Sequence, residues 1–119
     1  MASIDVKSFA TDSEVNEPNN ARVEAVNVNG QRIMRLTLQP GWRWSEDIKP
    51  TVGTDSCQAT HLGIVIKGTI AASHDDGTEV TYGAGDAYFV APGHDSWVVG
   101  DEEALVYEFH GAWGDKSTR

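Results

Sequence analysis

Short runs of strand-forming residues, each closed by a turn signal, constrain the fold of this chain more than any other feature. Asn29-Gly30 separates residues 22–28 from residues 31–38, and Asn-Gly is a strong signal for a two-residue hairpin. Asp75-Asp76-Gly77 divides two later runs in the same way. The sequence therefore predicts hairpins with Asn29-Gly30 and Asp76-Gly77 at their tips.

The same punctuation continues along the chain, with further turns predicted at Pro40-Gly41, residues 83–86, Pro92-Gly93 and residues 100–103. The runs between the turns are rich in β-branched and aromatic residues, which are typical of strands. Apolar residues nowhere recur at helical spacing over three turns. We expect a helix only at residues 11–17, where Pro18 would end it. This pattern predicts an all-β sandwich or barrel.

The length and the charge limit the domain count and the partners. At 119 residues the chain is expected to form one domain, with a barrel over residues 21–110 between peripheral segments 1–20 and 111–119. The 18 acidic and 9 basic residues give a net charge of −9, which argues against nucleic acid and membrane surfaces as partners. Cys57 is the single cysteine, and the start MASIDVKSF lacks the apolar core of a signal peptide. A cytoplasmic protein without an intramolecular disulfide is expected.

Several catalytic motifs are absent from the sequence. It contains no glycine-rich phosphate loop, no Gly-x-Ser-x-Gly elbow and no His-Glu-x-x-His helix. The nucleotide and hydrolase chemistries that depend on those motifs are therefore excluded.

Two stretches of the chain resemble the motifs of the cupin superfamily. His61-Leu-Gly-Ile-Val-Ile-Lys-Gly68 is similar to the end of the first motif, and Gly85-Asp86, Phe89-Val90, Pro92-Gly93 and His94 follow the outline of the second. The chain looks closest to small single-domain cupins that share its GWRWSE, PGHD and WVVGDE segments. The resemblance implies a double-stranded β-helix, a jelly-roll-like barrel, with a site inside the barrel mouth and often a homodimer.

The resemblance also implies a metal site, but this chain departs from the usual ligands. Metal-binding cupins use His-x-His, a Glu and a later His. Here His61 takes the place of the Glu, and either Asp55-x-Cys57 or Asp47-x-Lys49 stands at the paired histidines. Ser96 stands at the later histidine position. The usual metal site is therefore absent or rebuilt.

A rebuilt metal site would use the two motif histidines. His61 and His94 with either Cys57 or Asp47 would make three ligands, the number that an open catalytic zinc site keeps. Imidazole also suits iron, copper and nickel, and manganese is the remaining candidate, so the sequence leaves the divalent transition metal open. The alternatives are a solvated turn residue for His94 and a small buried apolar side chain for Cys57.

A ligand pocket is predicted around the same residues. Alternation along the strand places His61, Gly63 and Val65 on one face, where Gly63 leaves space for a pocket wall. The opposite face holds Leu62, Ile64 and Ile66, which we expect to pack between sheets.

Aromatic residues are expected to complete the pocket. Trp42 and Trp44, predicted on one strand face, would line an apolar cavity beside Tyr88, unless they serve core and dimer packing instead. We expect His61 and His94 to approach one another at the mouth of that cavity, with Tyr88 or Glu108 as an acid or base.

These observations favour a barrel that binds a small organic molecule. It would act either as a metal-dependent enzyme or as a metal-free binding or sensing module. A third hypothesis is a homodimer whose barrel is filled and whose surface carries the function. The sequence does not decide whether the protein is an enzyme.

Overall fold

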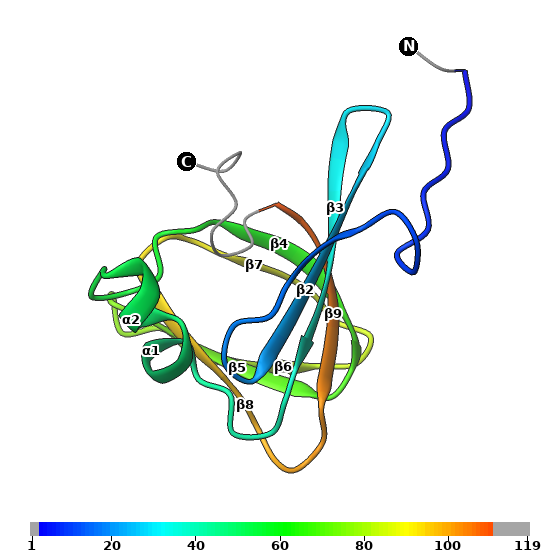
Figure 1. Ribbon diagram of the computed structural model, residues 1–119. Helices are drawn as coiled ribbons and strands as arrows, with labels where there is room; N and C mark the ends of the chain where they lie inside the picture. Colours follow the sequence, from blue (N-terminus) through cyan, green and yellow to red (C-terminus); the bar gives the residue numbers. More distant parts are fainter. Residues whose placement is uncertain (1–2, 111–119) are drawn as a thin grey trace.

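The computed structural model describes residues 3–110, and nine strands form about half of this part of the chain (Figure 1). The strands are β1 Glu14–Asn16, β2 Ala21–Val28, β3 Gln31–Leu38, β4 His61–Lys67, β5 Thr69–His74, β6 Glu79–Gly83, β7 Ala87–Val90, β8 His94–Val98 and β9 Ala104–His110. Two four-residue helices, α1 Trp44–Asp47 and α2 Lys49–Val52, connect β3 to β4.

The strands form two antiparallel sheets. The larger sheet has the order β1-β2-β3-β9-β4-β7, and the smaller has the order β6-β5-β8. Strands distant in sequence are neighbours in both sheets, as in a jelly roll. The predicted all-β barrel is confirmed.

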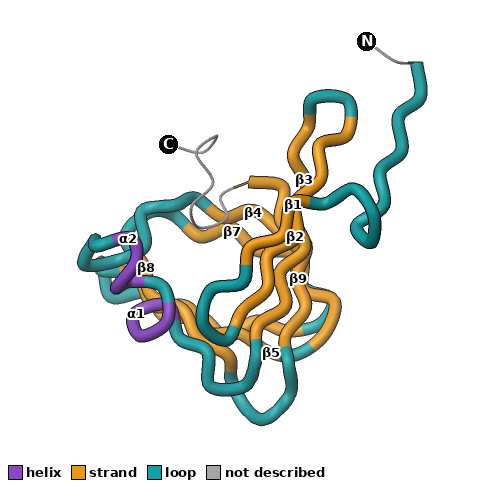
Figure 2. The backbone as a smooth tube through the Cα atoms, in the orientation of Figure 1, coloured by secondary structure: helices purple, strands orange, loops and turns teal. Residues whose placement is uncertain are grey.

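Both predicted hairpins are present. Asn29 and Gly30 have φ values of 47° and 82°, as a tight hairpin turn between β2 and β3 requires. The β2–β3 hairpin extends beyond the rest of the barrel (Figure 2). Gly77, with φ of 95°, lies in the turn between β5 and β6.

The core fills the space between the two sheets and the helices. Trp42 and Trp44 are its largest members, and each is 1% exposed. The other buried members are Ala21, Val23, Ala25, Met34, Leu36, Leu38, Ile48, Cys57, Val65, Ile70, Val98, Ala104 and Val106. Burial of this apolar area is the main stabilising term of the barrel.

The helical expectations were wrong. Residues 11–17 form a turn followed by β1, which pairs with β2 as the edge strand of the larger sheet. Helix is found instead at α1 and α2, so Trp42 and Trp44 do not share a strand face. Helix α1 depends on a distant contact, because the Asp95 carboxylate accepts a hydrogen bond from the Ser45 backbone N–H.

The prediction for the two faces of β4 was half right. His61, Gly63 and Val65 are buried and face the core, as expected. Leu62, Ile64 and Ile66 do not pack between sheets: they lie on the outer face and are 37–49% exposed. Apolar residues on both faces of a strand do not show which face the second sheet covers.

The division into a barrel and two peripheral segments stays a prediction. Residues 111–119 lie outside the described part of the chain. Between residues 3 and 110, the structure contains no helix that is long and apolar enough to cross a membrane.

Candidate metal centre

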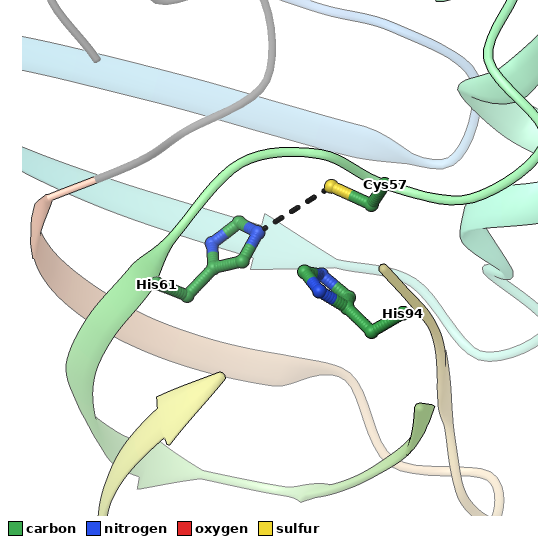
Figure 3. Close-up of side chains that lie close together, drawn as sticks. All are labelled: Cys57, His61 and His94. Atoms are coloured by element: carbon green, nitrogen blue, oxygen red, sulfur yellow. Dashed lines mark hydrogen bonds between the residues drawn. The ribbon is translucent and has the colours of Figure 1, made fainter. Parts of the chain in front are cut away.

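Three chain segments bring Cys57, His61 and His94 together (Figure 3). His61 begins β4, His94 begins β8, and Cys57 lies in the loop before β4. The loop is held to β8 by backbone hydrogen bonds: Cys57 N–H donates to the His94 carbonyl at 2.7 Å, and Gly93 N–H donates to the Cys57 carbonyl at 2.7 Å. The φ of 99° at Gly93 allows the turn that aims His94 inward.

The spacing of the three side chains suits one ion. The Cys57 sulfur lies 3.7 Å from His61 Nε2, and the two imidazole centroids are 4.9 Å apart. A tetrahedral zinc site with bonds of about 2.3 Å to sulfur and 2.0 Å to nitrogen needs a sulfur–nitrogen separation of about 3.6 Å. One ligand atom from each residue lies within 4.8 Å of the others, and all three residues are buried.

Hydrogen bonds orient both imidazoles. His61 Nδ1 lies 2.8 Å from Glu108 Oε1, and His94 Nδ1 lies 2.7 Å from the Ala91 carbonyl oxygen. Each acceptor fixes the proton on Nδ1, so Nε2 is the ring nitrogen that carries the lone pair in the neutral ring. Partners of this kind orient metal-ligating histidines and raise their basicity.

Electrostatics favour a thiolate beside a protonated imidazole when no metal is bound. Burial raises the pKa of Cys57, but hydrogen bonds to His61 and His94 outweigh burial and lower this pKa to about 6. Burial lowers the pKa of His61, but the charge of Glu108 and hydrogen bonds to Cys57 and Glu108 outweigh it and raise this pKa to about 10. The thiolate form is the one that binds a metal.

Glu108 also bonds to Tyr88, and Gly63 leaves the space that these two side chains occupy. The Tyr88 hydroxyl donates to Glu108 Oε2 at 2.6 Å, and burial raises the pKa of Tyr88, so the hydroxyl keeps its proton. A Cβ at Gly63 would lie 2.8 Å from the Tyr88 oxygen and 2.9 Å from Glu108 Cγ. The space predicted at Gly63 therefore exists, and it holds this pair of side chains.

The cavity beside the histidines is small. Its wall includes His61, His94, Trp42, Tyr88 and Glu108. Its volume, taken as the space open to the centre of a water molecule, is about 20 Å³. A buried water needs at least about 10–15 Å³ by this measure. The expected approach of His61 and His94 at one cavity is thus present, but the space fits a ligand of one or two heavy atoms.

Two predicted site residues lie elsewhere. Asp47 lies in α1, where its carboxylate accepts hydrogen bonds from Arg43 N–H and the Asn20 side chain, so Cys57 is the third member of the cluster. Trp44 is a core residue of α1.

The hydrogen bond between Glu108 and His61 was missed from the sequence. Its signal was available: Ala104, Val106 and Glu108 alternate on the inner face of β9, so a carboxylate sits on an otherwise apolar face. Glu108 also pairs in register with Gly63, two residues from His61.

Comparison with known proteins supports the fold. No protein-family model and no curated protein matches the chain. A protein of unknown function from Vibrio parahaemolyticus is 18% identical with a TM-score of 0.61, covering 83% of this chain and 99% of that one. Another from Rhizobium leguminosarum is 21% identical with a TM-score of 0.59, covering 79% and 83%.

An enzyme is also among the similar structures. A variant of oxalate decarboxylase from Bacillus subtilis is 17% identical with a TM-score of 0.63, and the match covers 99% of this chain but 32% of the decarboxylase. Its domains are cupins. At these identities the likeness shows the fold alone, and the chain has a cupin-like fold.

Proposed function

We propose that this cupin-like barrel is a metal-dependent protein whose ion is held by Cys57 Sγ, His61 Nε2 and His94 Nε2. The observation that carries the proposal is the fixed orientation of both imidazoles, whose Nδ1 atoms bond to Glu108 and the Ala91 carbonyl beside a buried thiol. A thiolate with two imidazoles suits zinc, iron, nickel or copper better than manganese, which prefers oxygen ligands.

Three protein ligands leave a coordination position for a small molecule. The bound ion would supply Lewis acidity to an oxygen atom placed there. Around that position, Glu108 holds the Nδ1 proton of His61, and the Tyr88 hydroxyl donates to the same carboxylate. Leu36, Ile70 and Val106 close the apolar side of the cavity and limit the entry of water.

Cobalt substitution tests the proposal. Metal-free protein titrated with Co²⁺ should bind one equivalent and develop the near-ultraviolet charge-transfer band of a cobalt–thiolate bond. Cys57→Ser should abolish that band, and His61→Ala should reduce the affinity at least about tenfold.

His74→Gln is the matched histidine control. His74 lies in the β5–β6 hairpin, where Nε2 bonds to the Pro92 carbonyl and Nδ1 accepts from Asp76 N–H, so it is less solvated than a hairpin tip suggests. This variant should retain one equivalent of Co²⁺ and the thiolate band. Wild-type protein that binds no stoichiometric metal, or binds it without the band, contradicts the proposal.

A second candidate function uses the same residues without a metal. Cys57, His61 and Glu108 form a thiol–imidazole–carboxylate chain, and the lowered pKa of Cys57 gives a thiolate at neutral pH. Such chains activate cysteine nucleophiles. Activity that survives removal of metal and is lost on alkylation of Cys57 would favour this function.

We also propose a homodimer, a cytoplasmic location and a small-molecule ligand. A reducing compartment would suit the metal centre, because it keeps Cys57 as a thiol.

A further inference from the structure

A second and larger space opens between β6 and β7. Strand β7 is an edge strand of the larger sheet, and β6 is an edge strand of the smaller sheet. The groove between them has a volume of about 640 Å³, within the range of about 300–1,000 Å³ that is typical of small-molecule sites.

The groove is lined by inner-face residues that the fold leaves uncovered. Val80 is opposite Ala72, and Tyr82 is opposite Ile70, so both side chains lie on the face that elsewhere packs in the core. Val80 is nevertheless 53% exposed. The exposed apolar side chains on the inner face of β6 therefore give an organic molecule a surface to bind.

Two tyrosines separate the groove from the candidate metal centre. Tyr82 and Tyr88 line both the groove and the small cavity beside His61. Their ring centroids are 4.8 Å apart, and the Tyr88 hydroxyl bonds to Glu108, the partner of His61. A molecule in the groove is thus one aromatic layer from the metal ligands.

The side chains of the groove suit a cation. Asp76 and Asp86 line it together with His74, whose Nδ1 accepts a hydrogen bond from Asp76 N–H, and none of its lining residues, all within the described chain, is a lysine or an arginine. One oxygen of each carboxylate accepts a backbone N–H, from Thr78 for Asp76 and from Gly83 for Asp86. The carboxylates are therefore held in place, and the chain as a whole carries a net charge of −9.

We propose that the β6–β7 groove binds a small organic ammonium compound with an apolar body. The apolar body lies on Val80, Tyr82 and Val90, and the ammonium group lies near Asp76 or Asp86. The idea that this compound is the substrate of the metal centre rests on the function proposed above. The binding of the compound to the groove does not depend on the metal.

Titration of ¹⁵N-labelled protein with phenethylammonium tests the proposal. The experiment is run with metal-free and metal-loaded protein, and with two probes of similar shape, 2-phenylethanol and 3-phenylpropionate. We expect saturable shifts of backbone amides in β6 and β7 with phenethylammonium in both protein forms, weaker binding of the alcohol and no saturation with the anion. Because metal-free protein is included, failure of the metal centre does not affect the result.

Variants locate the site. Asp76→Asn and Asp86→Asn keep an oxygen for the turn N–H groups but remove the charge, so each should weaken binding about two- to fivefold. Val80→Lys should abolish binding, and Asp101→Asn, in the exposed β8–β9 loop, should leave it unchanged. Absence of saturable shifts, or binding of the alcohol or the anion as tight as that of phenethylammonium, would overturn the proposal.

Discussion

At the scale of single residues, Glu108 determines what the cluster does. The residue is 4% exposed, and its carboxylate bonds to both His61 and Tyr88, so it is buried but paired. Its charge raises the pKa of His61, and that same bond orients the ring for a metal. In the proposed metal centre, metal and proton therefore compete for His61 Nε2.

This competition predicts the pH dependence of metal binding. Between the pKa of Cys57 near 6 and that of His61 near 10, the thiol is already ionised and His61 must lose one proton to bind the ion. Zinc affinity should therefore rise about tenfold per unit from pH 7 to pH 9, and fall more steeply below pH 6, where Cys57 also takes up a proton. Competition with a chromophoric chelator measures this slope. A flat profile from pH 7 to 9, as an unperturbed histidine would give, contradicts the assigned role of Glu108.

Glu108→Gln should change both the slope and the affinity. Loss of the charge lowers the pKa of His61, so the slope between pH 7 and pH 9 should flatten. The weaker support for the ring should cost about 10- to 100-fold in affinity at pH 9. Glu102→Gln, in the exposed β8–β9 loop, is the matched control and should keep the wild-type profile. An unchanged slope in Glu108→Gln would count against the coupling.

Among the elements, β4 contributes His61 to the site, and its three inward-facing residues have different roles. His61 is the proposed metal ligand, Gly63 makes room for Tyr88 and Glu108, and Val65 packs in the core. Pairing with β7 and β9 sets the register of these positions.

Gly63→Ala should destabilise the barrel and damage the site together. The added methyl group would collide with the Tyr107 carbonyl oxygen and press on the Tyr88 hydroxyl and Glu108. Overpacking of this kind costs about 1–3 kcal/mol of the free energy of unfolding. Urea denaturation measures the change. Leu62→Ala, on the outer face, should cost less than half as much at the same low protein concentration, and equal losses in the two variants would refute the packing assignment.

The sequence predicts an element when the residues that determine it are close together in the chain, and it fails when a distant contact determines the element. The hairpins at Asn29-Gly30 and Asp76-Gly77 follow from local turn chemistry, so they were predicted. Helix α1 depends on Asp95, about fifty positions along the chain, and was missed.

The candidate site shows the same limit. His61 and His94 were singled out by the resemblance to the two cupin motifs, and strand alternation and a Pro-Gly turn supported their placement. The choice of Cys57 over Asp47 required the backbone pairing of Cys57 with His94, which no local pattern contains.

At the scale of the whole molecule, the outer face of the larger sheet carries an apolar patch. Strands β4, β7 and β9 are adjacent there, and their exposed side chains include Leu62, Ile64, Ile66, Phe89 and Phe109. Contiguous apolar surface of this kind is typical of interaction sites. The N-terminal segment covers part of the same sheet, since Phe9 packs on Tyr107 and lies under the Arg35 guanidinium.

We predict that this patch pairs two chains into a homodimer. Light scattering should give twice the chain mass of 12.9 kDa at micromolar concentrations. Leu62→Lys should shift the protein to monomer, because a buried unpaired ammonium opposes association. Ile4→Lys, which changes an exposed apolar residue outside the patch, should remain dimeric. A wild-type protein that stays monomeric throughout this range would disprove the prediction.

X-ray absorption of the zinc-loaded protein measures whether one thiolate and two imidazoles hold a single ion. We expect one sulfur at about 2.3 Å, two imidazole nitrogens at about 2.0–2.1 Å and one further light atom. Cys57→Ser should remove the sulfur shell and leave the imidazole signal. A wild-type coordination shell without sulfur, or with fewer than two imidazoles, would contradict the claim.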